Sequence, residues 1–219
     1  MPPTMDGRFF QIEEHSGVCV LRLWSADETN RLTRDCVLAL IEQISRLAPD
    51  NQPLVIAGND RFFSAGADLA EIAALDGPSA YEFSKMGQSL MNAVASFPRA
   101  VFAAVDGYCM GGGLDLALAC RRRIASPHAV FGHRGAALGL ITGWGGTQRL
   151  PRLIGKARAL EMFVAAEKLT APKALALGLV DALSENPIAE AVRRIRQLPT
   201  DPQTTQNGPI ARISPPVIP

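Results

Sequence analysis

The stretch that decides the fold is Val105-Asp106-Gly107-Tyr108-Cys109-Met110-Gly111-Gly112-Gly113-Leu114-Asp115-Leu116-Ala117-Leu118-Ala119-Cys120. An apolar run over residues 100–105 predicts a buried strand, and the apolar segment after the three glycines predicts a helix. The glycines leave no side chain at this strand-to-helix turn. The first N–H groups of a helix have no intrahelical partner, and the helix dipole adds positive charge there. The turn is therefore expected to bind an anion, or an oxygen that becomes negatively charged during a reaction.

Asp115 lies three residues after Gly112, so a helix places both residues on one side, about one turn apart. A carboxylate beside such a turn is an arrangement for proton transfer next to a carbonyl group. The alternative is structural: a tight turn followed by an aspartate that the dipole favours in the first turn of the helix. This stretch alone does not separate the two interpretations.

The composition bounds the class of protein. The chain has 219 residues, 47% of them hydrophobic, which is enough for one domain with a sizeable core. The net charge is +1 and aromatic residues make up 6%, so neither a basic face nor a stacking platform for nucleic acid is expected. No segment approaches the ~18 apolar residues of a membrane span. The N-terminus has no signal-peptide pattern, so we expect a cytoplasmic protein. From the charge, the aromatic content and the lack of a long apolar segment, we expect neither nucleic-acid nor membrane partners.

Four cysteines, Cys19, Cys36, Cys109 and Cys120, show no C-x-x-C spacing and are expected to be reduced and mostly buried. No group of His, Cys and Asp residues has the spacing of metal ligands, so no metal or redox cofactor is expected. The basic run 121–123 follows the predicted central helix, where the negative end of the helix dipole explains it.

Expected strands and helices alternate along the chain, which predicts an α/β fold with parallel strand pairing. Strands are expected at residues 8–14, 18–24, 53–58, 99–105, 124–126, 129–131 and 179–181. Besides the central helix, helices are expected after the cap Thr33 and over residues 79–97, 147–153, 156–166, 171–177 (ended by Gly178) and 187–198. Residues 1–198 are thus expected to form a single domain, and the proline-rich residues 199–219 a disordered tail.

Two loops read together resemble the signature pair of the crotonase superfamily, the enoyl-CoA hydratase/isomerase family: Phe63-Ser64-Ala65-Gly66-Ala67-Asp68-Leu69 and Asp106-Gly107-Tyr108-Cys109-Met110-Gly111-Gly112-Gly113. Three later stretches agree in order and spacing: Phe131-Gly132, Gly143-Trp144-Gly145-Gly146-Thr147-Gln148-Arg149-Leu150-Pro151, and residues 171–181. The resemblance covers residues 8–183. It implies a crotonase-like spiral of β-β-α repeats, assembled as a homotrimer or hexamer, that binds acyl-CoA thioesters.

The resemblance also implies roles for single residues. The backbone N–H groups of Ala67 and Gly112 would hold the thioester oxygen and stabilise the enolate, with Asp115 as the acid/base. The adenine and pantetheine parts of CoA would be received by Ala65, Gly66, Ala67, Asp68 and Leu69. For Asp68 we favour a structural role as a helix N-cap. Coenzyme A enters as part of the substrate, and no separate cofactor is implied.

The sequence departs from the family pattern at both catalytic acids. Family hydratases place two glutamates over the substrate; here the first is Asp115, and the position of the second is Gly135. Shortening Glu to Asp retracts the carboxylate by ~1.5 Å, and a misplacement of ~1 Å can cost ~10²-fold in rate. Since activating water and protonating the α-carbon suit two carboxylates, the sequence predicts a slow hydratase or another reaction on the same fold.

Two further residues belong to the predicted site. His133 lies two residues before Gly135 and could act as an acid or base near neutral pH. Alternatively, it is a surface histidine or one that contacts a catalytic side chain and not the substrate. Trp144 could donate its indole N–H or wall the acyl pocket, and we favour the wall. The small residues 135–137 would leave room for a bulky or cyclic acyl group.

Three functions are therefore compatible with the sequence. The first is an enzyme of the enoyl-CoA hydratase type with an oxyanion hole and one acid/base carboxylate. The second keeps the fold and changes the reaction to double-bond isomerisation, thioester hydrolysis or decarboxylation. The third is a non-catalytic acyl-CoA-binding homologue, favoured by Gly135 and by a C-terminal helical region shorter than is usual in the family.

Overall fold

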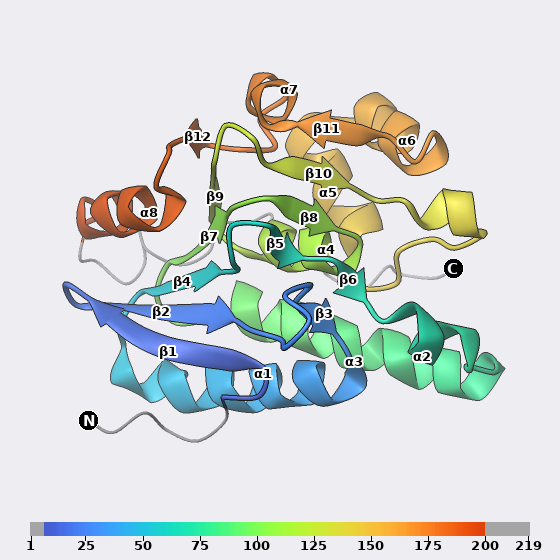
Figure 1. Cartoon of the computed structure of the whole chain (residues 1–219), viewed down its shortest axis with the longest axis horizontal. Coiled ribbons are helices and arrows are strands. Elements are labelled where there is room, and N and C mark those ends of the chain that lie inside the picture. The colour runs from blue at the N-terminus through green and yellow to red at the C-terminus, as the bar shows by residue number, and fades with distance from the viewer. Residues whose placement is uncertain (1–6, 200–219) are drawn as a thin grey trace, which may run out of the picture.

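The computed structural model in Figure 1 describes residues 7–199. The predicted proline-rich tail, apart from Pro199, lies outside the described residues. None of the described helices has both the length and the apolar character needed to cross a membrane. The helices and strands that the structure does describe follow the alternation expected from the sequence.

Two larger sheets hold most of the described strands. The first is six-stranded, in the order β1 (Phe10–His15), β2 (Val18–Leu23), β4 (Leu54–Ala57), β7 (Val101–Val105), β9 (Arg122–Ala125) and β12 (Ala182–Leu183). The second is four-stranded, in the order β11 (Lys168–Thr170), β10 (Val130–Gly132), β8 (Tyr108–Met110) and β5 (Phe62–Ser64). The pairs β1–β2 and β10–β11 are antiparallel, and the other pairs in these sheets are parallel. A short parallel pair joins β3 (Arg31–Leu32) to β6 (Gly66–Ala67).

From β4 to β10, the strands of the two larger sheets alternate along the chain between one sheet and the other, and each pair is followed by helices (Figure 1). β4 and β5 lead through β6 to α2 (Leu69–Ala73) and α3 (Gly77–Ala95). β7 and β8 lead to α4 (Gly112–Ala119), and β9 and β10 lead past a short 3₁₀ turn, η2 (Gly135–Leu138), to α5 (Gly146–Ile154) and α6 (Lys156–Val164). This order is the crotonase-like spiral of β-β-α repeats that the resemblance predicts, and the central helix α4 lies within it.

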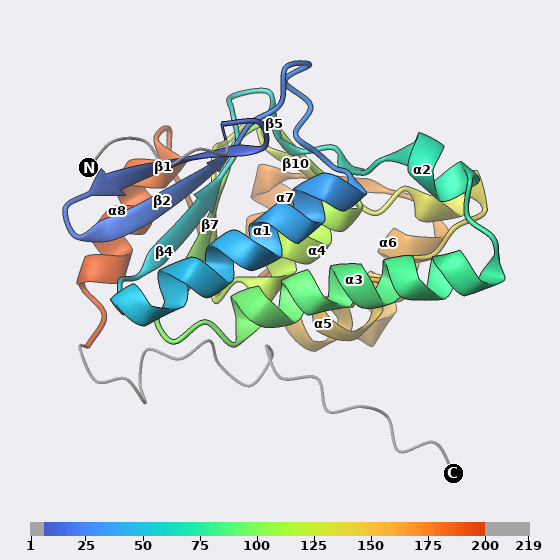
Figure 2. The same cartoon turned by 90° about the horizontal axis from the view of Figure 1, so that it is seen from below.

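Alternation along the strands gives the six-stranded sheet two buried faces. Leu54 and Ile56 of β4 belong to the large core cluster that includes α1 (Arg34–Leu47), which begins after the short β3. Val55, between them, belongs to a second cluster with Ile195 of α8 (Pro187–Arg196). Figure 2 shows α1 and α3 side by side, away from α8. The last described helix therefore covers the face of the sheet that the main core leaves open.

Several local predictions are confirmed. The Thr33 hydroxyl accepts a hydrogen bond from the Cys36 backbone N–H (3.2 Å) and caps α1. Gly178 has φ +77° directly after α7 (Ala171–Ala176) and its C-cap, as a residue that ends a helix should. All four cysteines are free and buried. Burial raises the pKa of the Cys120 thiol to about 12, so it remains a neutral core residue.

The set of expected strands is incomplete, and one expected strand is misplaced. β8 lies between the strand at 101–105 and the glycine turn, so the turn joins β8, and not β7, to α4. The short strands β3, β5, β6 and β11 were not expected either, and the last strand lies at 182–183 instead of 179–181. Leu179 and Val180 are apolar because they are buried, and both N–H groups donate to the Ala174 carbonyl oxygen of α7. Strands of two or three residues depend on their partners and leave little periodicity to read.

The basic run after α4 includes a buried arginine. The Arg123 guanidinium donates to the Cys120 carbonyl oxygen (2.9 Å) at the C-terminal end of α4 and to the Leu179 carbonyl oxygen (2.7 Å). It also pairs with the Asp181 carboxylate (3.3 Å). Burial lowers the pKa of Arg123, and the carboxylate of Asp181 opposes this effect. The predicted interaction with the negative helix end is confirmed for this residue, which also ties α4 to the segment before β12.

We expect Asp181→Asn to destabilise the fold, because it leaves the Arg123 charge buried without its counterion. Breaking a buried pair typically costs about 3 kcal/mol, which urea denaturation followed by circular dichroism would measure. Glu161→Gln is the matched control, since the Arg158–Glu161 pair (2.6 Å) is more than half exposed on both sides. The control should change the free energy of unfolding by less than about 1 kcal/mol. Equal effects of the two substitutions would contradict this role for Asp181.

Candidate active site

A cavity of about 630 Å³ lies beside α3, the start of α4 and the segment from His133 to Trp144. Most residues of the predicted site line it: Ala65, Ala67, Leu69, Gly112, Asp115, His133, Gly135 and Trp144. Two predicted residues, Gly66 and Asp68, do not. The structure thus brings together residues from both signature loops and from the later glycine-rich stretch.

The backbones of β6 and the start of α4 approach each other closely at this cavity. A Cβ atom added at Gly66 would lie 2.6 Å from the Met110 carbonyl oxygen and 3.0 Å from the Gly112 nitrogen. One added at Gly112 would lie 3.4 Å from the Ala67 nitrogen. Gly66 also has φ +94°, which side chains disfavour. Only glycine at position 66 lets the two backbones come this close, which places the Ala67 and Gly112 amides side by side.

The start of α4 retains the electrostatic character predicted for a helix N-terminus. Its cap residue Gly111 has φ +51° and makes no side-chain hydrogen bond to the helix. No cap side chain therefore neutralises the first N–H groups of α4, and both Gly111 and Gly112 line the cavity. The partial positive charge of this helix end acts on whatever occupies the cavity.

Asp115 lies one turn further along α4, and its side chain is only 2% exposed. Its Oδ1 atom lies 3.0 Å from Nε2 of His133. The hydroxyl of Thr142 donates a hydrogen bond to its Oδ2 atom. Among residues 7–199, Asp115 is the only carboxylate that lines the cavity. Sequence reasoning did not single out Thr142, which lies 27 positions from Asp115 and shares no motif with it.

Gly135 opens the 3₁₀ turn η2 on the wall of the cavity. A Cβ atom added there would lie 2.7 Å from the Leu140 carbonyl oxygen. A longer side chain would therefore require the loop to move, and substitution of Gly135 by glutamate does not simply restore a second carboxylate. The nearest acid/base group to this position in the chain is His133.

Trp144 fills the space between α3 and α4. Its side chain is buried, and a Cβ atom added at Gly87 would lie 2.1 Å from the indole Nε1. On the other side, one added at Gly112 would lie 2.5 Å from the indole Cζ3. The indole N–H donates to the Phe83 carbonyl oxygen (3.3 Å), so this donor is directed at backbone. Sequence reasoning singled out Trp144 but not Gly87, which provides its space.

A buried cation, the Arg149 guanidinium, lies next to the backbone of Trp144. Arg149, 1% exposed, donates to the Trp144 carbonyl oxygen (3.4 Å) and to Oδ1 of Asn92 (3.3 Å). Burial lowers the pKa of Arg149, and the negative charge of Asp115 opposes this effect. An arginine remains protonated under such conditions. The Asp115 carboxylate therefore lies in the field of a fixed positive charge.

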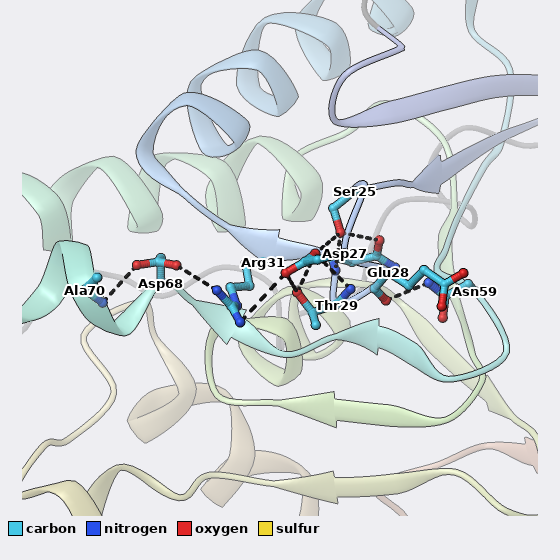
Figure 3. A network of polar contacts seen from close by, with 9 residues as sticks. Ser25, Asp27, Glu28, Thr29, Arg31, Asn59, Asp68 and Ala70 are labelled. Carbon is cyan, nitrogen blue, oxygen red and sulfur yellow. Dashed lines mark hydrogen bonds and ion pairs between the residues drawn. The ribbon is translucent and has the colours of Figure 1, made fainter.

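Asp68 has the structural role favoured from the sequence. Its Oδ1 atom accepts hydrogen bonds from the backbone N–H groups of Ala70 (2.8 Å) and Glu71 (3.1 Å), which caps α2. Its other oxygen lies 3.5 Å from the Arg31 guanidinium, which also approaches Asp27 (Figure 3). This exposed network fixes the loop of Ala65–Leu69 against β3. No group of His, Cys, Asp and Glu residues within the described chain could hold a metal ion.

Known proteins resemble this chain along most of its length. Residues 13–206 match the model of the enoyl-CoA hydratase/isomerase family. A probable enoyl-CoA hydratase of Bacillus subtilis is 42% identical over 66% of this chain and 56% of its own length. A crotonyl-CoA hydratase of Syntrophomonas wolfei is 35% identical over 78% of this chain and 66% of its own length. The crystal structure of an enoyl-CoA hydratase from Bacillus anthracis superposes with a TM-score of 0.82 at 29% identity, over 87% of this chain and 76% of that one.

The matched part of the chain thus spans 56% and 66% of the length of these two curated relatives. The solved structure supports the same β-β-α spiral that the strand order gives.

We expect Gly87→Ala to displace the Trp144 indole, since the new methyl group would overlap the ring. Overpacking of this kind costs typically about 1–3 kcal/mol, and the indole emission spectrum should shift in a Trp24→Phe background. Gly77→Ala, on the same helix, is the control, because a Cβ atom there meets nothing within 4 Å. An unchanged spectrum and an unchanged free energy of unfolding for Gly87→Ala would contradict the tight packing of this wall.

Proposed function

The chain belongs to the enoyl-CoA hydratase/isomerase family, and we propose that it hydrates enoyl-CoA thioesters in the cavity beside α3 and α4. The observation that carries this proposal is the close approach of Ala67 and Gly112 at the wall of a cavity that also holds a buried carboxylate, Asp115. Family membership makes an enoyl-CoA thioester the substrate class to expect. The named relatives that are hydratases support the same reaction type.

In this proposal the N–H groups of Ala67 and Gly112 donate to the thioester oxygen. When a nucleophile adds to the β-carbon, electrons of the double bond move to that oxygen and form an enolate. Donors that the packing of β6 against α4 holds in place need no rearrangement as this charge develops. The start of α4 adds its partial positive charge at the same point. Stabilisation is therefore greatest when the negative charge is on the oxygen.

Asp115 is proposed to move the proton. It accepts a proton from water as the water oxygen bonds to the β-carbon. It then donates that proton to the α-carbon as the enolate returns to a thioester. One O–H bond and the carbon–carbon π bond are broken, one C–O and one C–H bond are formed, and Asp115 ends as it began. A single carboxylate can perform both proton transfers in turn, whereas two carboxylates would each perform one of them.

Double-bond isomerisation is the second candidate, and the absence of a second carboxylate favours it. Moving a double bond within the acyl chain needs one base that removes a proton from one carbon and returns it to another. Position 135 holds glycine, and Asp115 is the only acid on the cavity wall within residues 7–199. Thioester hydrolysis, decarboxylation and binding without turnover are the remaining alternatives that product analysis would distinguish.

The substrate is proposed to enter past the loop of Ala65–Leu69, with its CoA portion on that loop and its acyl group toward Trp144. Ala65, Ala67 and Leu69 line the cavity, and Leu69 is 54% exposed at its edge. The small side chains allow a thioester to approach the backbone. In this arrangement Trp144 limits the space beside Gly112, and His133 borders the carboxylate.

We also propose that the chain assembles as a homotrimer or hexamer. A second cavity of about 510 Å³ lies between η2 and α6 and has a largely apolar lining. Three of its side chains are strongly exposed: Ile141 (74%), Leu160 (63%) and Val164 (69%). We call these three residues, of which Leu160 and Val164 lie on α6 and Ile141 in the loop before α5, the α6 face. Since such patches mark interfaces in soluble proteins, a second copy is the proposed occupant.

For the reaction itself, we expect Asp115→Ala and Asp115→Asn to reduce kcat by roughly 10²–10⁴-fold, the usual contribution of an acid/base group. Purified protein would be incubated with enoyl-CoAs of different length, and products would be identified by mass. Gain of one water indicates hydration, and a shifted double bond at unchanged mass indicates isomerisation. Free CoA indicates hydrolysis, and loss of CO₂ indicates decarboxylation. Unchanged turnover in both variants would exclude Asp115 as the base, and tight binding without any turnover would support the non-catalytic alternative.

For assembly, we expect light scattering after gel filtration to give three or six times the 23.4 kDa chain mass. Ile141→Glu combined with Val164→Glu should shift the protein toward the monomer, because two charges would be buried in the interface. Leu38→Glu is the control, since Leu38 is 50% exposed on α1, away from the α6 face. A monomeric wild-type protein would contradict the proposed assembly.

A further inference from the structure

We propose that Thr142 and His133 are positioning residues for the Asp115 carboxylate, and that position 146 is glycine because these three side chains meet against it. The proposal rests on the proposed acid/base function of Asp115. It assigns a role to Thr142, which no motif indicated, and it gives His133 a role that differs from direct proton transfer to the substrate.

Each donor holds a different oxygen of the carboxylate. His133 Nε2 lies 3.0 Å from Oδ1, and the Thr142 hydroxyl donates to Oδ2. With Asp115 ionised, the proton of the His133 ring is assigned to Nε2, since a carboxylate can only accept. An ionised carboxylate offers about four acceptor positions, so two remain for a substrate proton. The two hydrogen bonds fix the orientation of the carboxylate and leave two of its acceptor positions free.

An aspartate in this place needs such contacts. The torsion that turns a carboxylate about its last bond is broad, so the plane of the group is undefined unless partners hold it. Asp115 is nearly fully buried, where an oxygen without a donor costs more than it would in water. Both donors come from the segment between β10 and α5, which is far from α4 in the sequence. This segment therefore sets the orientation of a side chain that α4 supplies.

Gly146, the first residue of α5, completes the arrangement. A Cβ atom added there would lie 2.2 Å from Oδ1 of Asp115 and 2.9 Å from Nε2 of His133. It would also lie 2.9 Å from the Cγ2 methyl group of Thr142. All three side chains therefore pack against the Cα atom of Gly146. Gly146→Ala would push the cluster apart without removing any polar group, which makes it a test independent of the donors.

The experiment compares variants that keep or remove each donor. Thr142→Val and His133→Leu should each lower kcat by about 10–10²-fold, as expected for misplacement of a reacting group. KM for the enoyl-CoA should stay within a few-fold of the wild-type value, because neither residue is proposed to bind CoA. Thr142→Ser and His133→Gln retain a donor and should recover most of the lost kcat. Gly146→Ala should lower kcat like the donor deletions.

Two exposed residues serve as controls. His128 pairs with Asp106 at 2.8 Å with its side chain 64% exposed, so His128→Gln tests loss of a His–Asp pair elsewhere. Thr170 makes no side-chain hydrogen bond to α7, so Thr170→Val tests loss of a hydroxyl alone. Both should keep wild-type kcat and KM. Circular dichroism and urea denaturation would establish that each compared variant is folded.

The outcomes separate this inference from the proposed function. If Asp115→Asn abolishes turnover while Thr142→Val and Gly146→Ala leave kcat unchanged, the positioning role is wrong and the acid/base role of Asp115 stands. If Asp115→Asn keeps full activity, Asp115 is not the acid/base group, and the positioning roles that rest on it are overturned with it. If His133→Gln is as inactive as His133→Leu, a hydrogen-bond donor is insufficient at that position, and the positioning role of His133 is overturned.

Discussion

The candidate site depends on the close approach of two backbones, β6 and the start of α4. Gly66 makes this approach possible, because a Cβ atom there would lie 2.6 Å from the Met110 carbonyl oxygen. The contact joins chain segments about 45 residues apart and places the Ala67 and Gly112 amides on one cavity wall. The main core lies behind it, with Leu114 and Leu116 of α4 fully buried. The helix that carries Asp115 can therefore shift little relative to these amides.

The sequence predicted features that depend on local backbone rules. The cap Thr33, the helix-ending Gly178 and the N-cap Asp68 all follow from hydrogen bonds or dihedral angles within a few residues. Elements that depend on distant partners were missed, as with the short strands β8 and β11. The apolar pair Leu179 and Val180 was misread as a strand, because burial against α7 gives the same residue types as a buried strand.

The candidate site also combines residues that local motifs predict with residues that only tertiary packing brings together. The order of motifs brought Ala67, Gly112 and Asp115 into one prediction, and all three line one cavity. The contact of Thr142 with Asp115 joins residues 27 positions apart, and nothing in the local sequence of Thr142 announces it. The local sequence gives no reason for glycine at position 87, and only the tertiary structure shows that the Trp144 indole packs against it. Side-chain partners across a cavity are set by tertiary packing, which single-sequence patterns do not encode.

Relative to the family pattern, this chain has aspartate in place of the first glutamate and glycine in place of the second. These two departures affect different steps of the proposed reaction. A shorter side chain changes where the proton is held, and donors from the β10–α5 segment can compensate by fixing its orientation. Loss of the second acid changes how many protons can be held at once, and no rearrangement of one carboxylate compensates for that. The proposed oxyanion donors, Ala67 and Gly112, are backbone groups, so both changes leave them intact. The proposed function therefore depends mainly on enolate stabilisation by backbone donors, with Asp115 proposed to move the protons one at a time.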